Sequence, residues 1–188
     1  MRLSSKFMLA AAVAALPLVG CATAEKASTQ VQGAVQAQTT PTLSTTDSTF
    51  FDNASRSGIE EVTFSQLARQ QATRSSTRAF AVKMVDGHTT VNQQLTQLAM
   101  TKGITPPTTM DTTHQAAYDA LGKLHGRAFD RTYLNGQATD HAATLQVFQN
   151  EAQNGTDPEV KAFAARIAPE IQSHLNMAEK LGGHPAAS

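Results

Sequence analysis

Three histidines and one glutamate lie at positions where helical apolar patterns would ordinarily carry a hydrophobic residue. His88, His141 and His174 each stand within an apolar stripe, and Glu61 stands among small residues on a fourth stripe. Imidazole and carboxylate groups are good ligands for transition metals, and helical bundles build metal sites from inward side chains on facing helices. The sequence therefore predicts a mononuclear centre of Glu61, His88, His141 and His174 that holds one Zn, Cu or Fe ion.

The same four residues have a second interpretation, as a buried polar network bonded internally or to trapped water. The choice depends on whether they lie at one level along the bundle, which the sequence does not fix. Four more carboxylates lie close enough on the helical wheel to accept hydrogen bonds from the imidazoles: Asp86, Asp140, Glu151 and Glu170. Glu60, next to Glu61, is expected to be exposed.

Several kinds of chemistry find no support in the sequence. A di-iron centre would need a glutamate three residues before histidine on two helices, but Val85 and Ile171 occupy those positions. There is no Gly-x-Ser-x-Gly elbow and no glycine-rich phosphate loop. The remaining histidines are expected in solvent: His114, His125 and His184. No catalytic residue and no organic cofactor is predicted.

The spacing of apolar residues predicts that these side chains are positioned by an all-α bundle. Four long helices are expected, over about 49–73, 75–100 and 128–153 and from about 156 onward, with a shorter helix over 111–125. The expected interior stripes are Phe51, Ala54, Gly58, Glu61, Ser65, Ala68 and Ala72; Phe80, Met84, His88, Val91, Leu95 and Leu98; Ala117, Tyr118, Leu121 and Leu124; Leu134, Ala138, His141, Leu145, Phe148 and Ala152; and Val160, Phe163, Ile167, Ile171, His174, Ala178 and Leu181.

The first 46 residues are expected to lie outside the bundle. Residues 1–20 have a basic start and an apolar run, which is typical of a secretory signal. They end in Leu18-Val19-Gly20-Cys21, which resembles the lipobox of bacterial lipoproteins, and Ala22 after the cysteine implies sorting to the outer membrane. Residues 21–46 are predicted to form a lipidated cysteine and a flexible tether. The bundle is expected over 47–182, followed by a tail over 183–188.

The amino-acid composition limits the kinds of binding partner that can be expected. Cys21 is the only cysteine, so no disulfide can form within the chain. Because the whole chain has fifteen basic and fifteen acidic side chains, removing Arg2 and Lys6 leaves thirteen against fifteen. Such a balance, without a basic cluster, excludes nucleic acid as an expected partner. The membrane, through Cys21, is the only partner that the sequence indicates, and no protein partner is predicted.

Five ordered motifs resemble an uncharacterised bacterial family of exported ferritin-like proteins, often labelled predicted outer membrane proteins. The resemblance covers residues 48–182 and implies a ferritin-like four-helix bundle with a short crossover helix, but no established activity. The function expected is that of a cell-envelope lipoprotein, either one that binds a metal in envelope stress or metal handling, or a non-enzymatic structural or interaction lipoprotein. The motifs are residues 58–62, 83–89, 128–134, Asp140-His141, and 161–164 with His174.

Overall fold

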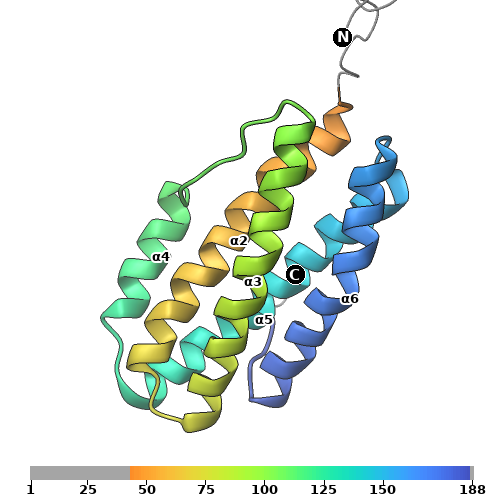
Figure 1. Cartoon of the computed structure of the whole chain (residues 1–188). Helices are drawn as coiled ribbons and strands as arrows, with labels where there is room; N and C mark the ends of the chain where they lie inside the picture. Colours follow the sequence, from red (N-terminus) through yellow and green to blue (C-terminus); the bar gives the residue numbers. More distant parts are fainter. Residues whose placement is uncertain (1–42, 187–188) are drawn as a thin grey trace, which may run out of the picture. The chain divides into compact units, whose positions relative to one another are not determined.

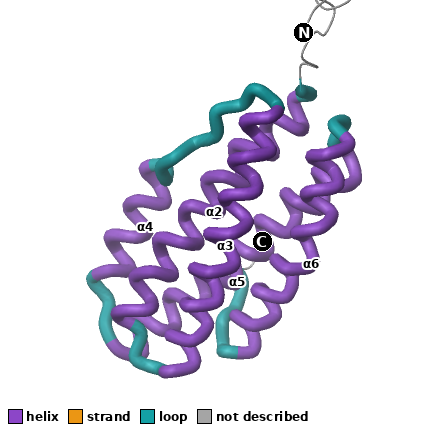
Figure 2. The backbone as a smooth tube through the Cα atoms, in the orientation of Figure 1, coloured by secondary structure: helices purple, strands orange, loops and turns teal. Residues whose placement is uncertain are grey.

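The computed structural model describes residues 43–186, and the regular structure within that range is entirely helical (Figures 1 and 2). Four long helices form the bundle, with α2 and α3 packed as one pair and α5 and α6 as another. The shorter α4 lies in the connection from α3 to α5, beside α2. The five helices are α2 (Thr45–Gln71), α3 (Ser75–Thr101), α4 (Thr112–Gly122), α5 (Gly126–Asn154) and α6 (Pro158–Lys180).

Local chemistry explains where the helices begin and end. The first long helix was expected from residue 49, but α2 begins at Thr45 because Ser44 and Asp47 form a capping box. At α6, Asp157 accepts hydrogen bonds from the first backbone amides and Pro158 occupies the first turn. Gly103, with a φ of 73°, follows α3 in the left-handed conformation that glycine adopts without strain.

The predicted interior stripes of the four long helices form the core. All their members are buried except Leu98, Ala152 and Leu181, which are partly buried against it. The prediction for the short helix was wrong in part, because Ala117 is exposed and only Leu121 is buried. The two long-helix pairs therefore enclose one continuous apolar core that also holds the three histidines.

Several predictions fall outside the described residues. These are the signal segment, the lipobox with Cys21, and the tether up to residue 42. Within residues 43–186, no helix combines the length and apolarity needed to cross a membrane.

A pair of buried carboxyl groups ties the start of α2 to the turn between α5 and α6. Asp47 is fully buried and accepts hydrogen bonds from the Thr156 amide at 2.9 Å and the Thr156 hydroxyl at 2.6 Å. These bonds and that of Ser44 outweigh burial and hold the pKa of Asp47 well below its usual range. Glu151 is also fully buried, and neither of its oxygens has a donor among the described residues. Burial and the neighbouring Asp47 raise the pKa of Glu151 to about 7, so this carboxyl is largely protonated below that pH.

This carboxyl pair predicts a pH-dependent stability. The pKa of Glu151 rises from 4.5 in the unfolded chain to about 7 in the folded one, so its contribution is complete below pH 4.5 and is lost as the pH rises toward 7. Glu151→Gln supplies a permanent donor to Asp47. Urea unfolding of both proteins should show the variant gaining stability relative to the parent as the pH increases from about 4.5 to about 7. The control Glu179→Gln changes an exposed glutamate, so its stability difference from the parent should not depend on pH. The same pH-independent difference in Glu151→Gln would contradict the raised pKa of Glu151.

Candidate metal centre

Three long helices bring their histidines to one level of the bundle. His88 comes from α3, His141 from α5 and His174 from α6, and one ring nitrogen of each lies within 4.8 Å of the other two. His88 Nε2 and His141 Nε2 are 3.3 Å apart. Two imidazole nitrogens bound to one tetrahedral zinc ion lie about 3.3–3.4 Å apart, given Zn–N bonds of about 2.0–2.1 Å. The condition that the sequence left open, a common level, is met by the three histidines.

Glu61 lies behind His141 and outside this group of three. Its Oε1 is 3.2 Å from His141 Nδ1, and its Oε2 accepts a hydrogen bond from Gln137 Nε2 at 2.6 Å. His141 Nδ1 is also 2.8 Å from the backbone oxygen of Gln137, one turn earlier on α5. A proton on Nδ1 satisfies that oxygen and leaves the lone pair of His141 Nε2 directed at His88. The structure thus places the Glu61 carboxyl beside His141 and outside the group of three facing ring nitrogens.

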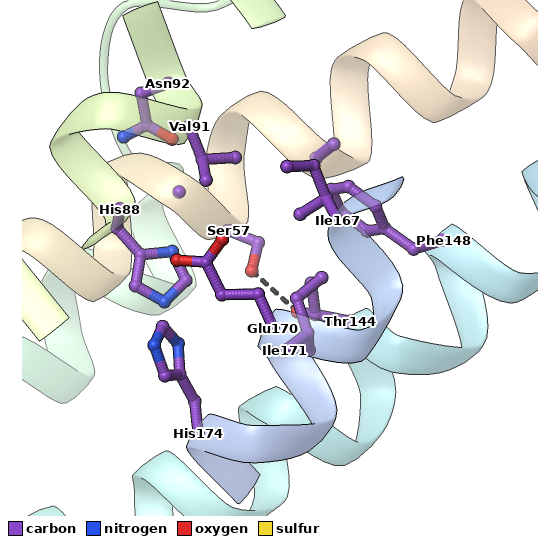
Figure 3. Close-up of a pocket in the computed structure, with 12 residues that line it drawn as sticks. Ser57, His88, Val91, Asn92, Thr144, Phe148, Ile167, Glu170, Ile171 and His174 are labelled. Atoms are coloured by element: carbon purple, nitrogen blue, oxygen red, sulfur yellow. Dashed lines mark hydrogen bonds between the residues drawn. The ribbon is translucent and has the colours of Figure 1, made fainter. Parts of the chain in front are cut away.

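A small cavity of about 10 Å³ adjoins the histidines (Figure 3). It is about large enough for a single water molecule or ion. His88, His174 and the half-buried Glu170 line it, and in Figure 3 the Glu170 carboxylate lies beside the His88 ring. Gly87 makes the arrangement possible, because a Cβ there would lie 3.2 Å from Glu170 Oε1 and 3.3 Å from His174 Cε1.

Burial keeps the three imidazoles uncharged. Their exposed fractions are 6% for His88, 1% for His141 and 7% for His174. Burial lowers the pKa of His141 and of His174 to about 4, and it lowers the pKa of His88 well below the usual range, with the other two rings adding to the effect. Neutral imidazole is the form that binds metals. Burial also raises the pKa of Glu61 well above its usual range.

The other carboxylates proposed to support the histidines lie in different places. Asp86 is exposed. Glu151 lies beside Asp47 and does not line the cavity next to the histidines. Of the four, Glu170 alone shares the cavity with the histidines. The sequence could not assign Gln137, whose amide and backbone oxygen hold Glu61 and His141, because an interior glutamine carries no metal-site signal by itself.

Two expectations about individual side chains were wrong. Glu60 is buried, with 6% exposure, because α4 covers it. His114 of α4 was expected in solvent, but its side chain is only half-exposed and contacts two carboxyl groups. Its Nε2 is 3.1 Å from Glu60 Oε2, and its Nδ1 is 2.8 Å from Asp111 Oδ2. His125 and His184 are exposed, as expected.

An outer pocket of about 220 Å³ surrounds that contact, and we define it by Glu60, Asp111, His114 and Asp140. Burial and the charge of Asp140 raise the pKa of Glu60 to about 8. Burial raises the pKa of Asp140 to about 6, so this carboxylate remains largely ionised at neutral pH. The outer pocket is therefore polar and anionic.

Fold and site together define an all-helical bundle with a buried trio of histidines. Residues 32–181 match the model described as a domain of unknown function, DUF4142, and the chain belongs to this family. No curated protein matches the chain significantly.

Two solved structures show that the fold occurs elsewhere. A DUF305 fragment from Deinococcus radiodurans is similar with a TM-score of 0.67 and 14% sequence identity, over 76% of this chain and 99% of that one. A DUF305 protein from Streptomyces coelicolor, described as a candidate secreted protein, is similar with a TM-score of 0.63 and 15% identity, over 76% and 96% of the two chains. At these identities the likeness shows the helical-bundle fold alone.

The buried imidazoles predict an unusual titration. The pKa of His141 and of His174 falls from 6.5 in the unfolded chain to about 4 in the folded one. Their contribution to stability is therefore complete above pH 6.5 and is lost as the pH falls toward 4. NMR of the metal-free protein should show both rings titrating with midpoints near 4, and midpoints near 6.5 would mean that water reaches them.

Proposed function

We propose that this protein binds a single transition-metal ion, Zn, Cu or Fe, through His88, His141 and His174. The observation that carries the proposal is the convergence of three neutral ring nitrogens, from three helices, within 4.8 Å of one another. A point equidistant from nitrogens so placed lies within bonding reach of all three after a small movement. Three protein ligands leave a fourth position for water or another ligand, and Glu170 lines the cavity beside His88 and His174.

The surroundings of the trio suit an ion. The Nδ1 atom of His174 has no hydrogen-bond partner among the described residues, although it is buried. Metal-bound histidines ordinarily donate a hydrogen bond from the other ring nitrogen to a carbonyl or carboxylate. His141 Nδ1 has the backbone oxygen of Gln137 as this acceptor, with Glu61 Oε1 3.2 Å away. In this proposal Glu61, predicted from the sequence as a ligand, instead orients His141 and balances charge.

The setting that we propose for this site is the cell envelope. Three observations support this setting. The sequence motifs resemble a family of exported proteins, one structural neighbour is described as a candidate secreted protein, and Cys21 ends a lipobox-like segment. We infer a lipoprotein anchored through Cys21, in the outer membrane and facing the periplasm, that serves in metal handling or envelope stress. The pairing of α2 with α3 and of α5 with α6, with α4 in the crossover, supports a ferritin-like bundle.

One observation favours a second function. The 3.3 Å separation of His88 Nε2 and His141 Nε2 also suits a hydrogen bond in which one ring donates to the other. In that case the trio is a polar network that fixes the packing of α3 against α5, and the protein is a non-enzymatic structural or interaction lipoprotein. The two functions differ in whether an ion is bound.

Metal content distinguishes them. An untagged protein that lacks residues 1–21, purified without chelator, should carry about one equivalent of metal by elemental analysis. His141→Ala should carry none, while remaining folded by circular dichroism. His114→Ala, which removes a half-exposed histidine outside the trio, should retain the metal. Absence of metal from the parent, even after incubation with Zn²⁺, Cu²⁺ and Fe²⁺, would favour the polar network.

The role of Glu61 gives a separate prediction. Glu61→Gln keeps the size of the side chain and its bond to Gln137 but cannot balance the charge of an ion behind His141. Titration calorimetry should show metal affinity reduced by about 10–100-fold, the usual effect of changing such a supporting group. Glu151→Gln, a matched change at a buried glutamate remote from the trio, should leave the affinity unchanged. Equal losses in both variants would indicate general destabilisation.

The lipid anchor is tested on Cys21. Cells that express the full chain and are fed a clickable fatty acid should label the protein, and Cys21→Ser should abolish the label. The labelled protein should sediment with outer membranes because several acyl chains anchor it stably. Labelling of the serine variant would refute acylation at Cys21.

A further inference from the structure

The cavity beside the histidines and the outer pocket share one wall. Ala54, Ser57 and Thr144 line both. The Ser57 and Thr144 hydroxyls are 2.7 Å apart and hydrogen-bonded across α2 and α5, as the dashed line in Figure 3 shows. Both side chains are half-buried. The hydroxyl pair and Ala54 thus lie between the outer pocket and the cavity beside His88 and His174.

The outer pocket has the charge that would gather cations. Asp111 and Asp140 supply this charge, because the pKa of about 8 leaves the buried Glu60 largely protonated at neutral pH. Arg56 also lines it, but its guanidinium is paired with Asp52 at 3.0 Å, which offsets its charge. A concave site lined by one sign of charge raises the local concentration of the opposite ion and its rate of association.

The inner cavity gives an independent reason to expect a cation there. His174 lines it, is 7% exposed, and has an Nδ1 atom without a partner among residues 43–186. Figure 3 shows the Glu170 carboxylate beside the His88 ring, and the Ser57 hydroxyl directed toward Thr144. Among its mostly apolar lining, the cavity places the hydroxyls of Ser57 and Thr144, the Glu170 carboxylate and the rings of His88 and His174 around one space.

We propose that the outer pocket is the entrance through which a divalent cation reaches the three histidines, and that the Ser57–Thr144 hydroxyl pair is its gate. This inference rests on the proposed metal site. The anionic pocket collects the hydrated ion, the hydroxyls part and supply oxygen contacts as water is shed, and Glu170 receives the ion beside His88. Since α4 carries His114 and Asp111, the crossover helix forms the outer side of the entrance.

The kinetics of Co²⁺ binding to the metal-free protein test the gate. Co²⁺ absorbance follows association in a stopped-flow instrument, and excess chelator gives dissociation. Thr144→Val keeps the volume of the side chain but replaces the hydroxyl with a methyl group, so association and dissociation should both slow several-fold. Thr89→Val makes the same change at an exposed position next to His88 in the sequence, and it should leave both rates as in the parent.

The charge of the entrance is tested with a second pair of variants. Asp140→Asn should slow association several-fold and weaken its dependence on salt, because one steering charge is lost. Asp119→Asn removes an exposed carboxylate of α4 outside the outer pocket and should do neither. Parent-like rates in both Thr144→Val and Asp140→Asn would overturn the entrance while leaving the metal site intact. A parent that binds no Co²⁺ would overturn the site and the entrance together.

Discussion

The central constraint on this structure is that three imidazole rings lie together, buried within a largely apolar core. Each ring carries two polar nitrogens, and burying a polar group without a partner costs free energy. The His141 ring meets this need with a hydrogen bond from Nδ1 to the backbone oxygen of Gln137 on its own helix. The Nδ1 atom of His174 has no partner among the described residues. Leucine at the same positions would avoid the cost and pack well. In the proposed metal centre, one cation would accept a lone pair from each of the three rings.

The residues packed around the three rings restrict their positions. Small residues let the helices approach where the rings meet: at Gly87 any side chain would press on His174, and at Gly58 a Cβ would lie 1.9 Å from Asn92 Oδ1. Aromatic side chains fill the core on either side, with Phe50 and Phe148 stacked edge to face at 5.0 Å in one direction and Phe129 and Tyr133 parallel at 6.3 Å in the other. The polar centre is thus a short layer between two apolar ones, which limits how far the rings can move.

The sequence predicted the helices and their inner faces well, because both follow from a local period of 3.6 residues. His88, His141 and His174 were identified in this way. Their common level was not predictable, since it depends on the stagger between helices that loops and packing determine together. The same limit explains the errors. Glu60 was expected in solvent because its burial comes from α4, which is distant in the chain, and Glu61 was grouped with the ligands because the wheel gives direction but not depth.

Anomalous X-ray diffraction from crystals of the protein grown with Zn²⁺ tests the central claim most directly, because it places the ion without reference to any mutation. The account predicts one strong peak at the zinc edge, about 2.0–2.1 Å from a ring nitrogen of His88, His141 and His174. Glu61 should then lie against His141 without touching the ion. A peak confined to the outer pocket at His114, or an empty centre at saturating Zn²⁺, would contradict it.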